Sequence, residues 1–161
     1  MFKVLSLLAA LALGACVPII VPVPISAPPK EVRTLTAQAP LDVRFDQVLA
    51  KVRQQRNLAP LAFNAQLAAV AQVHAADMVA RGYFSHVSPE GANVTARASD
   101  RGLPACGLGE NIAQGQISAA EVFEGWMGSG PHRRNILNPR MASYGLGRSG
   151  DTWVLILYAP C

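Results

Sequence analysis

The sequence contains few charged residues, few aromatic residues and only three cysteines among its 161 residues. Charged residues make up 15% and aromatic residues 6%, and no basic stripe with interleaved aromatic side chains occurs, so nucleic-acid binding is not expected. The apolar run at residues 4–13 is too short to span a bilayer. Hydrophobic residues make up 51%, which argues against a disordered chain, and the length suits a single domain.

The N-terminus has the architecture of an export signal. Lys3 supplies a positive start, the apolar run follows, and the letters LGAC end at Cys16. This ending resembles a bacterial lipobox, at which a lipoprotein signal peptidase cuts before a cysteine that carries diacylglycerol. Residues 1–15 are therefore predicted to be a lipoprotein signal peptide, and lipid on Cys16 would hold the protein to a membrane without a spanning helix. The alternative is an ordinary secretory signal that is cut nearby.

The odd number of cysteines fits this interpretation. If Cys16 carries lipid, Cys106 and Cys161 are free to form a disulfide in an oxidising compartment. Cys161 is the last residue, so this disulfide would hold the terminal strand beside the segment that contains Glu110. The alternative is a pair of reduced thiols.

The region between the lipidation site and the domain is rich in proline. Residues 17–40 contain six prolines, which makes a helix or a central strand improbable there. We expect residues 16–40 to form an extended, semi-rigid tether between the lipid and the domain. The folded domain should then occupy residues 41–161.

Helical periodicity and capping residues predict five helices. Asn64 is a good N-cap and Gly82 a good residue to follow a helix end. Ser118 and Glu121 have the spacing of a capping box, and Ile117 is placed to act as its hydrophobic staple. The predicted helices span residues 42–56, 64–81, 93–101, 118–127 and 131–137.

Three strands are predicted, at residues 109–113, 144–148 and 152–159. Residues 149–151 form a turn signal, so the last two strands should make an antiparallel hairpin. Residues 154–157 are apolar without alternation, which favours a strand that is covered on both faces. Several helices around such a sheet predict an α+β fold, a three-layer α-β-α sandwich.

Three residues are candidates for a functional site. Glu110 is a carboxylate inside an apolar, strand-like run, and it needs a partner because burial of a lone carboxylate is costly. His86 lies in a loop after a predicted helix, where functional side chains are common. His132 begins a short helix, and a helix N-terminus disfavours imidazolium, so its ring should be neutral and able to bind metal. Together the three could form a zinc-type site with an open position.

Other polar residues have simpler interpretations. His74 lies on the apolar stripe of the helix at 64–81, which predicts a core histidine hydrogen-bonded to the main chain or to a carboxylate. Ser88 is a possible nucleophile, but no nucleophile-elbow motif surrounds it. From the residues alone, a satisfied polar core is as good an account of His86, Glu110 and His132 as a metal site.

Four motifs in order resemble one family. They are HAADM from His74, FSHVSPEG from Phe84, GENIA from Gly109 and WMGSGPHRRNIL from Trp126. This pattern resembles the CAP superfamily of cysteine-rich secretory proteins, antigen 5 and pathogenesis-related 1 proteins, also called SCP domains, in its short bacterial branch. The resemblance covers residues 41–159. It implies an α-β-α sandwich with a central cleft, in which many members hold two histidines and two glutamates.

The resemblance assigns residues to that cleft. His86 and His132 match the two histidines, which can bind a divalent metal such as Zn²⁺ in the family, and Glu110 matches one glutamate. The position of the second glutamate is Ser129. The loss of one carboxylate argues against a two-carboxylate acid–base mechanism and weakens the support for a bound metal.

Three functions are compatible with these observations. The first is a membrane-anchored extracytoplasmic protein that binds a small ligand, a lipid or a divalent metal in the cleft. The second is a hydrolase, protease- or esterase-like, in which His86 or His132 acts as base and Glu110 orients it, with or without a metal-bound water. The third is a structural envelope protein. Val17 stands where an aspartate retains some lipoproteins at the inner membrane, which favours the outer membrane, facing the periplasm.

Overall fold

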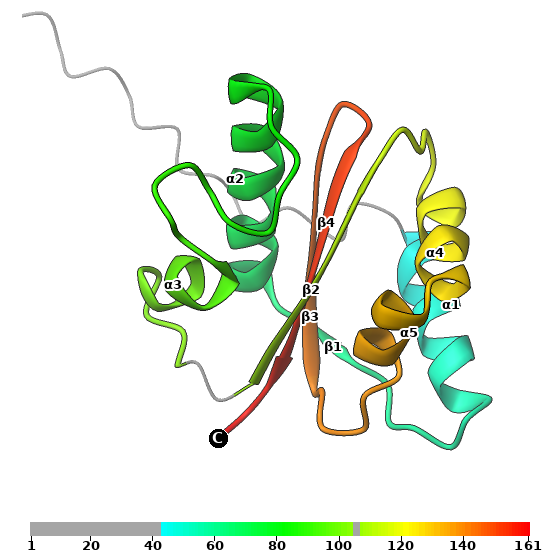
Figure 1. The fold of residues 1–161 in the computed structure, drawn as a ribbon. Helices are drawn as coiled ribbons and strands as arrows, with labels where there is room; N and C mark the ends of the chain where they lie inside the picture. The colour runs from blue at the N-terminus through cyan, green and yellow to red at the C-terminus, as the bar shows by residue number, and fades with distance from the viewer. Residues whose placement is uncertain (1–42, 105–106) are drawn as a thin grey trace, which may run out of the picture. The chain divides into compact units, whose positions relative to one another are not determined.

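The computed structural model describes residues 43–104 and 107–161 (Figure 1). The predicted signal peptide, the predicted lipidation site Cys16, the predicted tether and Cys106 all lie outside these described residues. The predicted disulfide between Cys106 and Cys161 therefore stays a prediction.

A four-stranded mixed sheet forms the middle of the fold, with the strand order β1-β3-β4-β2. The short strand β1 is parallel to β3, whereas the β3–β4 and β4–β2 pairs are antiparallel. The predicted hairpin is confirmed, since β3 and β4 are joined by a two-residue turn. Strand β1 was not expected from the sequence. The strands are β1 (Ala62–Phe63), β2 (Gly107–Gln114), β3 (Ser143–Ser149) and β4 (Thr152–Ala159).

Strand β4 is buried on both faces, as the run of apolar residues predicts. Trp153, Leu155 and Leu157 belong to one hydrophobic cluster. Val154 and Ile156, which alternate with them, belong to a second cluster. Because successive side chains of a strand point to opposite faces, this strand supplies the centre of both cores.

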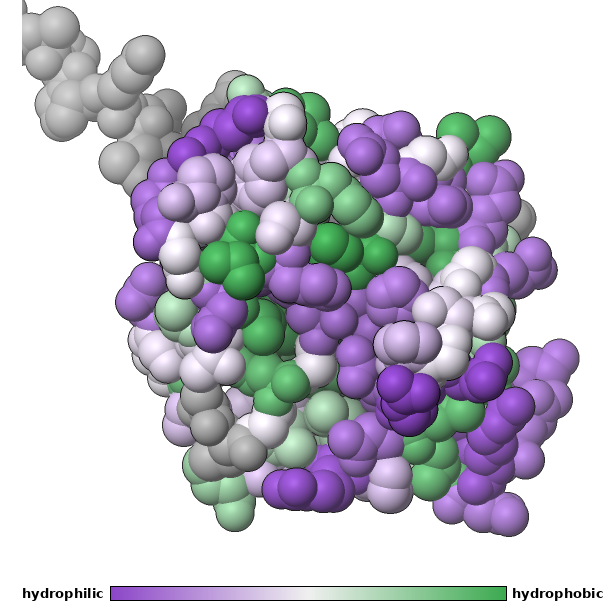
Figure 2. All heavy atoms as spheres, viewed as in Figure 1, coloured by the Kyte–Doolittle hydropathy of each residue, from purple (hydrophilic) through white to green (hydrophobic). Residues whose placement is uncertain are grey.

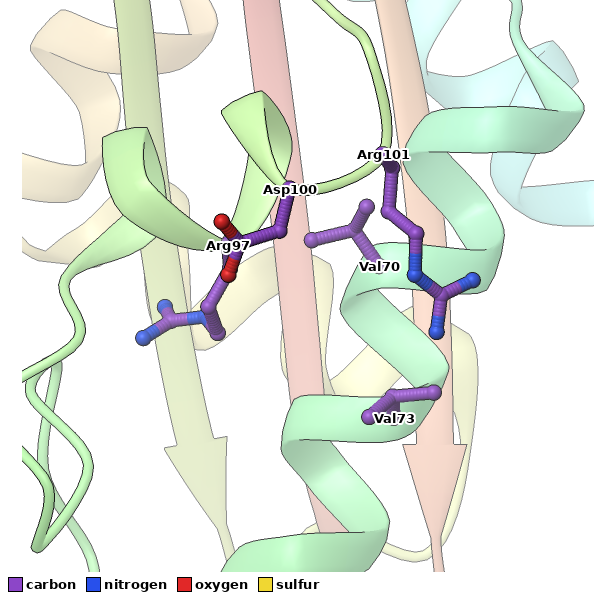
Figure 3. Close-up of a pocket in the computed structure, with 5 residues that line it drawn as sticks. All are labelled: Val70, Val73, Arg97, Asp100 and Arg101. Carbon is purple, nitrogen blue, oxygen red and sulfur yellow. The ribbon is translucent and has the colours of Figure 1, made fainter.

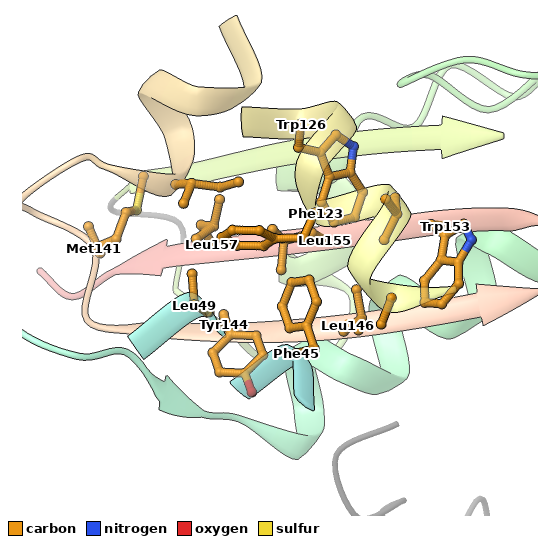
Figure 4. Close-up of a cluster of buried hydrophobic side chains, with 14 residues drawn as sticks. Phe45, Leu49, Phe123, Trp126, Met141, Tyr144, Leu146, Trp153, Leu155 and Leu157 are labelled. Atoms are coloured by element: carbon orange, nitrogen blue, oxygen red, sulfur yellow. The ribbon is translucent and has the colours of Figure 1, made fainter. Parts of the chain in front are cut away.

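One face of the sheet is covered by α1 (Val43–Gln54), α4 (Ala119–Gly128) and α5 (Gly130–Ile136). Figure 4 shows the aromatic side chains that fill the space between these helices and the sheet. The Phe45 ring lies 5.7 Å from the Phe123 ring in an edge-on arrangement.

Helix α1 is joined to the other elements of its layer by a fully buried arginine. Arg53 is 0% exposed and donates from Nη1 to the carbonyl of Ile136, the last residue of α5, over 2.8 Å. It also donates to the carbonyls of Ala59, Asn138 and Met141. Burial lowers the pKa of Arg53, and these four carbonyls replace the water that a cation would otherwise bind.

The other face is covered by α2 (Ala65–Arg81) and α3 (Val94–Ser99). Two glycines of β3 allow α2 to approach very closely. A Cβ atom on Gly145 would lie 2.1 Å from the main-chain nitrogen of Ala68, and one on Gly147 would lie 2.2 Å from that of Gln72. The helices on both faces confirm the α-β-α sandwich (Figure 1).

The predicted helix caps are mostly confirmed. Asn64 accepts hydrogen bonds from two main-chain nitrogens at the start of α2, and Gly82 ends that helix at a φ of 66°. Ser118 Oγ accepts from Glu121 N, and the Glu121 carboxylate accepts from Ile117 N. The hydrophobic staple was wrong, because Ile117 is 73% exposed. The main-chain nitrogen of Ile117 donates to the Glu121 carboxylate, while the Ile117 side chain faces solvent.

Candidate functional site

The candidate site is centred on β2, an edge strand of the sheet. Ile112 packs in the cluster beneath α2, so Glu110, two residues earlier, faces the same layer. Asn111 points to the opposite layer, where it contacts α5. Side chains from both helical layers can therefore meet at this edge of the sheet.

The Glu110 carboxylate is buried and has two partners. Its side chain is 3% exposed, and its Oε1 atom lies 2.8 Å from Nδ1 of His86. Its Oε2 atom accepts a hydrogen bond from Nη2 of Arg97 over 2.5 Å. One partner of the Glu110 carboxylate is therefore His86, as expected from the sequence. The other is Arg97, which was not expected. A cation beside the carboxylate offsets the cost of its burial.

Arg97 is the residue that the sequence analysis missed. It is the one charged residue of α3, and its Nη1 atom also donates to the carbonyls of Ala92 and His86, over 2.7 and 3.1 Å. One signal could have identified it. A buried Glu110 needs a cation, and α3 carries an arginine between the motifs of His86 and Glu110.

The loop that carries His86 is fixed by its neighbours. His74 is 1% exposed, and its Nε2 atom lies 3.0 Å from the carbonyl oxygen of Ser85. This confirms the core histidine predicted from the apolar stripe. Burial lowers the pKa of His74, so the ring is neutral and Nε2–H donates to Ser85. Ser88 Oγ accepts from Ala92 N, which assigns that hydroxyl to the loop rather than to His86.

His132 is positioned from the other layer. Its carbonyl accepts a hydrogen bond from Asn111 Nδ2 over 3.1 Å. Asn135 in turn donates to Asn111 Oδ1 over 2.8 Å and to the carbonyl of Glu110 over 3.3 Å. Two asparagine side chains thus fix the first turn of α5 against strand β2, and sequence analysis gave no role to either.

Electrostatics link the two candidate histidines. The pKa of His132 is lowered first by burial and then by the charge of His86. Both causes favour the neutral form of His132, which agrees with the expectation from its place near a helix start. In the described residues, no hydrogen bond or ion pair joins the His132 ring to Glu110.

The position that the family resemblance gives to a second glutamate is Ser129 in this chain. Ser129 lies between α4 and α5, and its main-chain nitrogen donates to the carbonyls of Gly125 and Trp126. No group of three or more His, Cys, Asp or Glu side chains within residues 43–104 and 107–161 could hold a metal ion. Glu110 is already bound on both oxygens, by His86 and by Arg97.

A pocket of about 180 Å³ lies behind Arg97, between α2 and α3. It is lined by Val70 and Val73 of α2 and by Arg97, Asp100 and Arg101. In Figure 3 the Arg97 guanidinium points away from the two valines. The pocket therefore borders the stem of Arg97, while the guanidinium serves Glu110.

The fold and the site together define a class of protein. A mixed sheet between two helical layers, with a histidine–carboxylate pair at one edge strand, is the SCP type of α-β-α sandwich. A sequence model of the CAP family, described as the cysteine-rich secretory protein family, matches residues 47–156. The chain belongs to this family.

Similar proteins come from bacteria. The uncharacterized protein YkwD of Bacillus subtilis is 38% identical over 103 residues, which cover 63% of this chain and 40% of that protein. An extracellular protein with an SCP domain from Bacillus anthracis has a TM-score of 0.70 and 29% identity, over 73% of this chain and 39% of that one. The chain thus spans less than half the length of both.

A third similarity concerns the fold alone. An outer surface protein of Borrelia burgdorferi has a TM-score of 0.66 at 21% identity, over 71% of this chain and 88% of that one. Within the described part of the chain, no helix is long and apolar enough to cross a membrane.

Proposed function

We propose that this protein is an extracytoplasmic CAP-domain protein that binds a divalent metal or a small ligand through His86 and His132. The observation that carries this proposal is the contact between His86 Nδ1 and Glu110 Oε1. A carboxylate that accepts from one imidazole nitrogen orients the ring and leaves the other nitrogen as a ligand. The His86 side chain is 52% exposed, so that second nitrogen is accessible.

The donor set fits Zn²⁺ in part. Neutral imidazoles are good zinc ligands, and the lowered pKa of His132 favours the neutral ring. Glu110 acts behind His86 rather than as a direct ligand. His86 and His132 would hold the ion, and other positions would stay open to water or to a bound molecule, where zinc could polarise an oxygen ligand.

Exposed apolar residues close to His86 in the sequence favour a ligand with an apolar part. Phe84 and Val87 flank His86 in the same loop and are 47% and 44% exposed. Figure 2 shows apolar and hydrophilic areas next to each other on the face that includes strand β2. A small lipid or another envelope molecule with a polar head would match this mixture.

Zinc titration of the purified protein by calorimetry tests the metal. We expect binding that weakens at least about tenfold in His86→Ala and in His132→Ala, because each removes a direct ligand. His74→Gln is the matched control, since it replaces the third histidine and keeps a donor for Ser85. A folded protein that binds no zinc, or zinc binding that is unchanged in both alanine variants, would contradict the metal site.

The predicted anchor is tested separately. Lipidation of Cys16 would place the protein in the bacterial cell envelope, and the extracellular location named for the similar Bacillus anthracis protein supports export. We expect the protein in the membrane fraction and the Cys16→Ser variant in the soluble fraction. Val17 favours the outer membrane, and fractionation of the two membranes checks this placement.

Hydrolysis is the second candidate, because a histidine hydrogen-bonded to a carboxylate is also the arrangement of a general base. It predicts turnover of a peptide or ester that disappears in Glu110→Gln while the protein stays folded. Activity that survives this substitution, or panels with no turnover, would leave binding as the function.

A further inference from the structure

We propose that Arg97 is a positioning residue that determines which ring nitrogen of His86 binds Glu110 and which is left free for a ligand. One guanidinium holds both the main chain of His86 and the carboxylate that binds its ring. Nη1 donates to the His86 carbonyl over 3.1 Å, and Nη2 donates to Glu110 Oε2 over 2.5 Å. This inference deepens the proposed function and rests on it.

Packing alone does not orient the His86 ring. Its side chain is 52% exposed, whereas those of Glu110 and Arg97 are 3% and 11% exposed. The orientation of the ring therefore depends on its hydrogen bond to Glu110. The orientation of Glu110 depends in turn on Arg97, which occupies Oε2 and leaves Oε1 for His86.

The direction of these hydrogen bonds fixes the tautomer of His86. A carboxylate bound to a guanidinium accepts hydrogen bonds and donates none, so the hydrogen of a neutral His86 ring lies on Nδ1. Nε2 then carries the lone pair, on the exposed side of the ring. If Arg97 is removed, the Glu110 carboxyl loses its fixed partner, and the preference for this tautomer should be lost.

Lysine cannot replace Arg97 fully. Its single nitrogen keeps the positive charge but lacks the planar fork that reaches two acceptors in different directions. Arg97→Lys should therefore keep the charge balance around Glu110 while the His86 carbonyl or the carboxylate loses its donor. This variant therefore distinguishes the effect of the guanidinium geometry from the effect of the positive charge.

The test is nitrogen NMR of the imidazole rings in the metal-free protein, at a pH where His86 is neutral. We expect the Nδ1–H tautomer in the wild type, a mixture of tautomers in Arg97→Gln and an intermediate result in Arg97→Lys. Zinc affinity should fall about 10–100-fold in Arg97→Gln, the usual effect of losing a group that orients a ligand.

Arg101→Gln is the matched control, because Arg101 lines the same pocket and is exposed. It should leave the tautomer and the zinc affinity unchanged. If Arg97→Gln does not fold, Arg97→Lys carries the test. An unchanged Nδ1–H tautomer in the folded Arg97 variants would overturn the inference. A tautomer that depends on Arg97, in a protein that binds no zinc, would keep this inference and reject the metal site.

Discussion

The two faces of the sheet are packed by different means. On the α1/α4/α5 face, large aromatic side chains fill the space, with Phe45 at their centre. On the α2/α3 face, the backbone of α2 lies directly on strand β3, because Gly145 and Gly147 have no side chains. The helices of the α1/α4/α5 face thus contact the sheet through side chains, whereas α2 contacts it through its main chain.

This difference affects the candidate site. Side chains can change rotamer when a neighbour changes, whereas a backbone contact has no such freedom. The loop of His86 begins where α2 ends, and Glu110 faces the same layer. The rigid face is thus the one that positions the histidine–carboxylate pair. We expect abrupt effects from changes on that face and graded effects on the aromatic face.

The largest effect is expected at Gly147. Any side chain there would place a Cβ atom 2.2 Å from the nitrogen of Gln72, so α2 would have to move away from the sheet. Gly147→Val should cost about 5 kcal/mol or more, enough to remove most of the folded population of a small domain. Circular dichroism with chemical denaturation measures the loss.

Gly125→Ala is the control for this glycine. Gly125 lies in α4, with no atom within 4 Å of an added Cβ, and alanine favours a helix over glycine by about 1 kcal/mol. This variant should be as stable as the wild type or more so. A Gly147→Val protein with wild-type stability would remove the proposed difference between the two faces.

The second effect concerns the aromatic face. Phe45→Ala should cost about 3–5 kcal/mol, because it leaves a cavity among Phe123, Trp126 and Tyr144. Phe45→Leu should lose much less, since a smaller side chain can still fill most of the space. Equal losses in both variants would mean that this face is as rigid as the other. Urea denaturation of the three proteins measures the difference.

The third effect concerns the buried cation of the same face. Arg53→Met keeps the apolar stem but leaves the carbonyls of Ile136 and Asn138 without donors, at an expected cost of about 2–3 kcal/mol. Arg56→Met, an exposed change nearby, should stay within about 0.5 kcal/mol of the wild type. If Arg53→Met is as stable as Arg56→Met, the four hydrogen bonds contribute nothing net.

Local signals in the sequence predicted most of the elements. Asn64 and Gly82 fixed the ends of α2, and the turn at residues 149–151 fixed the hairpin, because caps and turns depend on a few adjacent residues. The two-residue strand β1 was too short for a periodic signal. The Ile117 staple failed because a staple needs a tertiary partner, which the sequence does not display.

The candidate site was only partly predictable. The need of Glu110 for a partner follows from burial, and the motif resemblance pointed to His86. Arg97 and Asn135 act through contacts between segments that are separate in the sequence. Asn135 lies within the fourth motif, but the sequence does not show what its side chain contacts. The close approach of α2 to β3 was equally hidden, since a glycine in a strand can also indicate a bulge.

The smallest expected effect tests a polar group on the rigid face. Burial lowers the pKa of His74 below its unfolded value of 6.5, and the charge of Arg97 adds to this. As the pH falls below about 6.5, the unfolded chain takes up a proton that the folded chain excludes, so stability is present above this pH and is lost toward lower pH. Between about pH 7.5 and 5.5, the wild type should lose more stability than His74→Gln, which carries no titrating group at this position.

The control for His74→Gln is the alkaline range. Above about pH 7.5, the free energies of unfolding of the two proteins should differ by a constant amount. The His74 ring of the wild type is neutral there in both the folded and the unfolded chain. If the stability difference between the two proteins changes only on the acid side, the α2/α3 layer disfavours protonation of the buried His74 ring. Parallel curves down to about pH 5.5 would mean that the layer opens enough to admit the charge, and the contrast between a rigid and an adaptable face would then hold for glycine contacts alone.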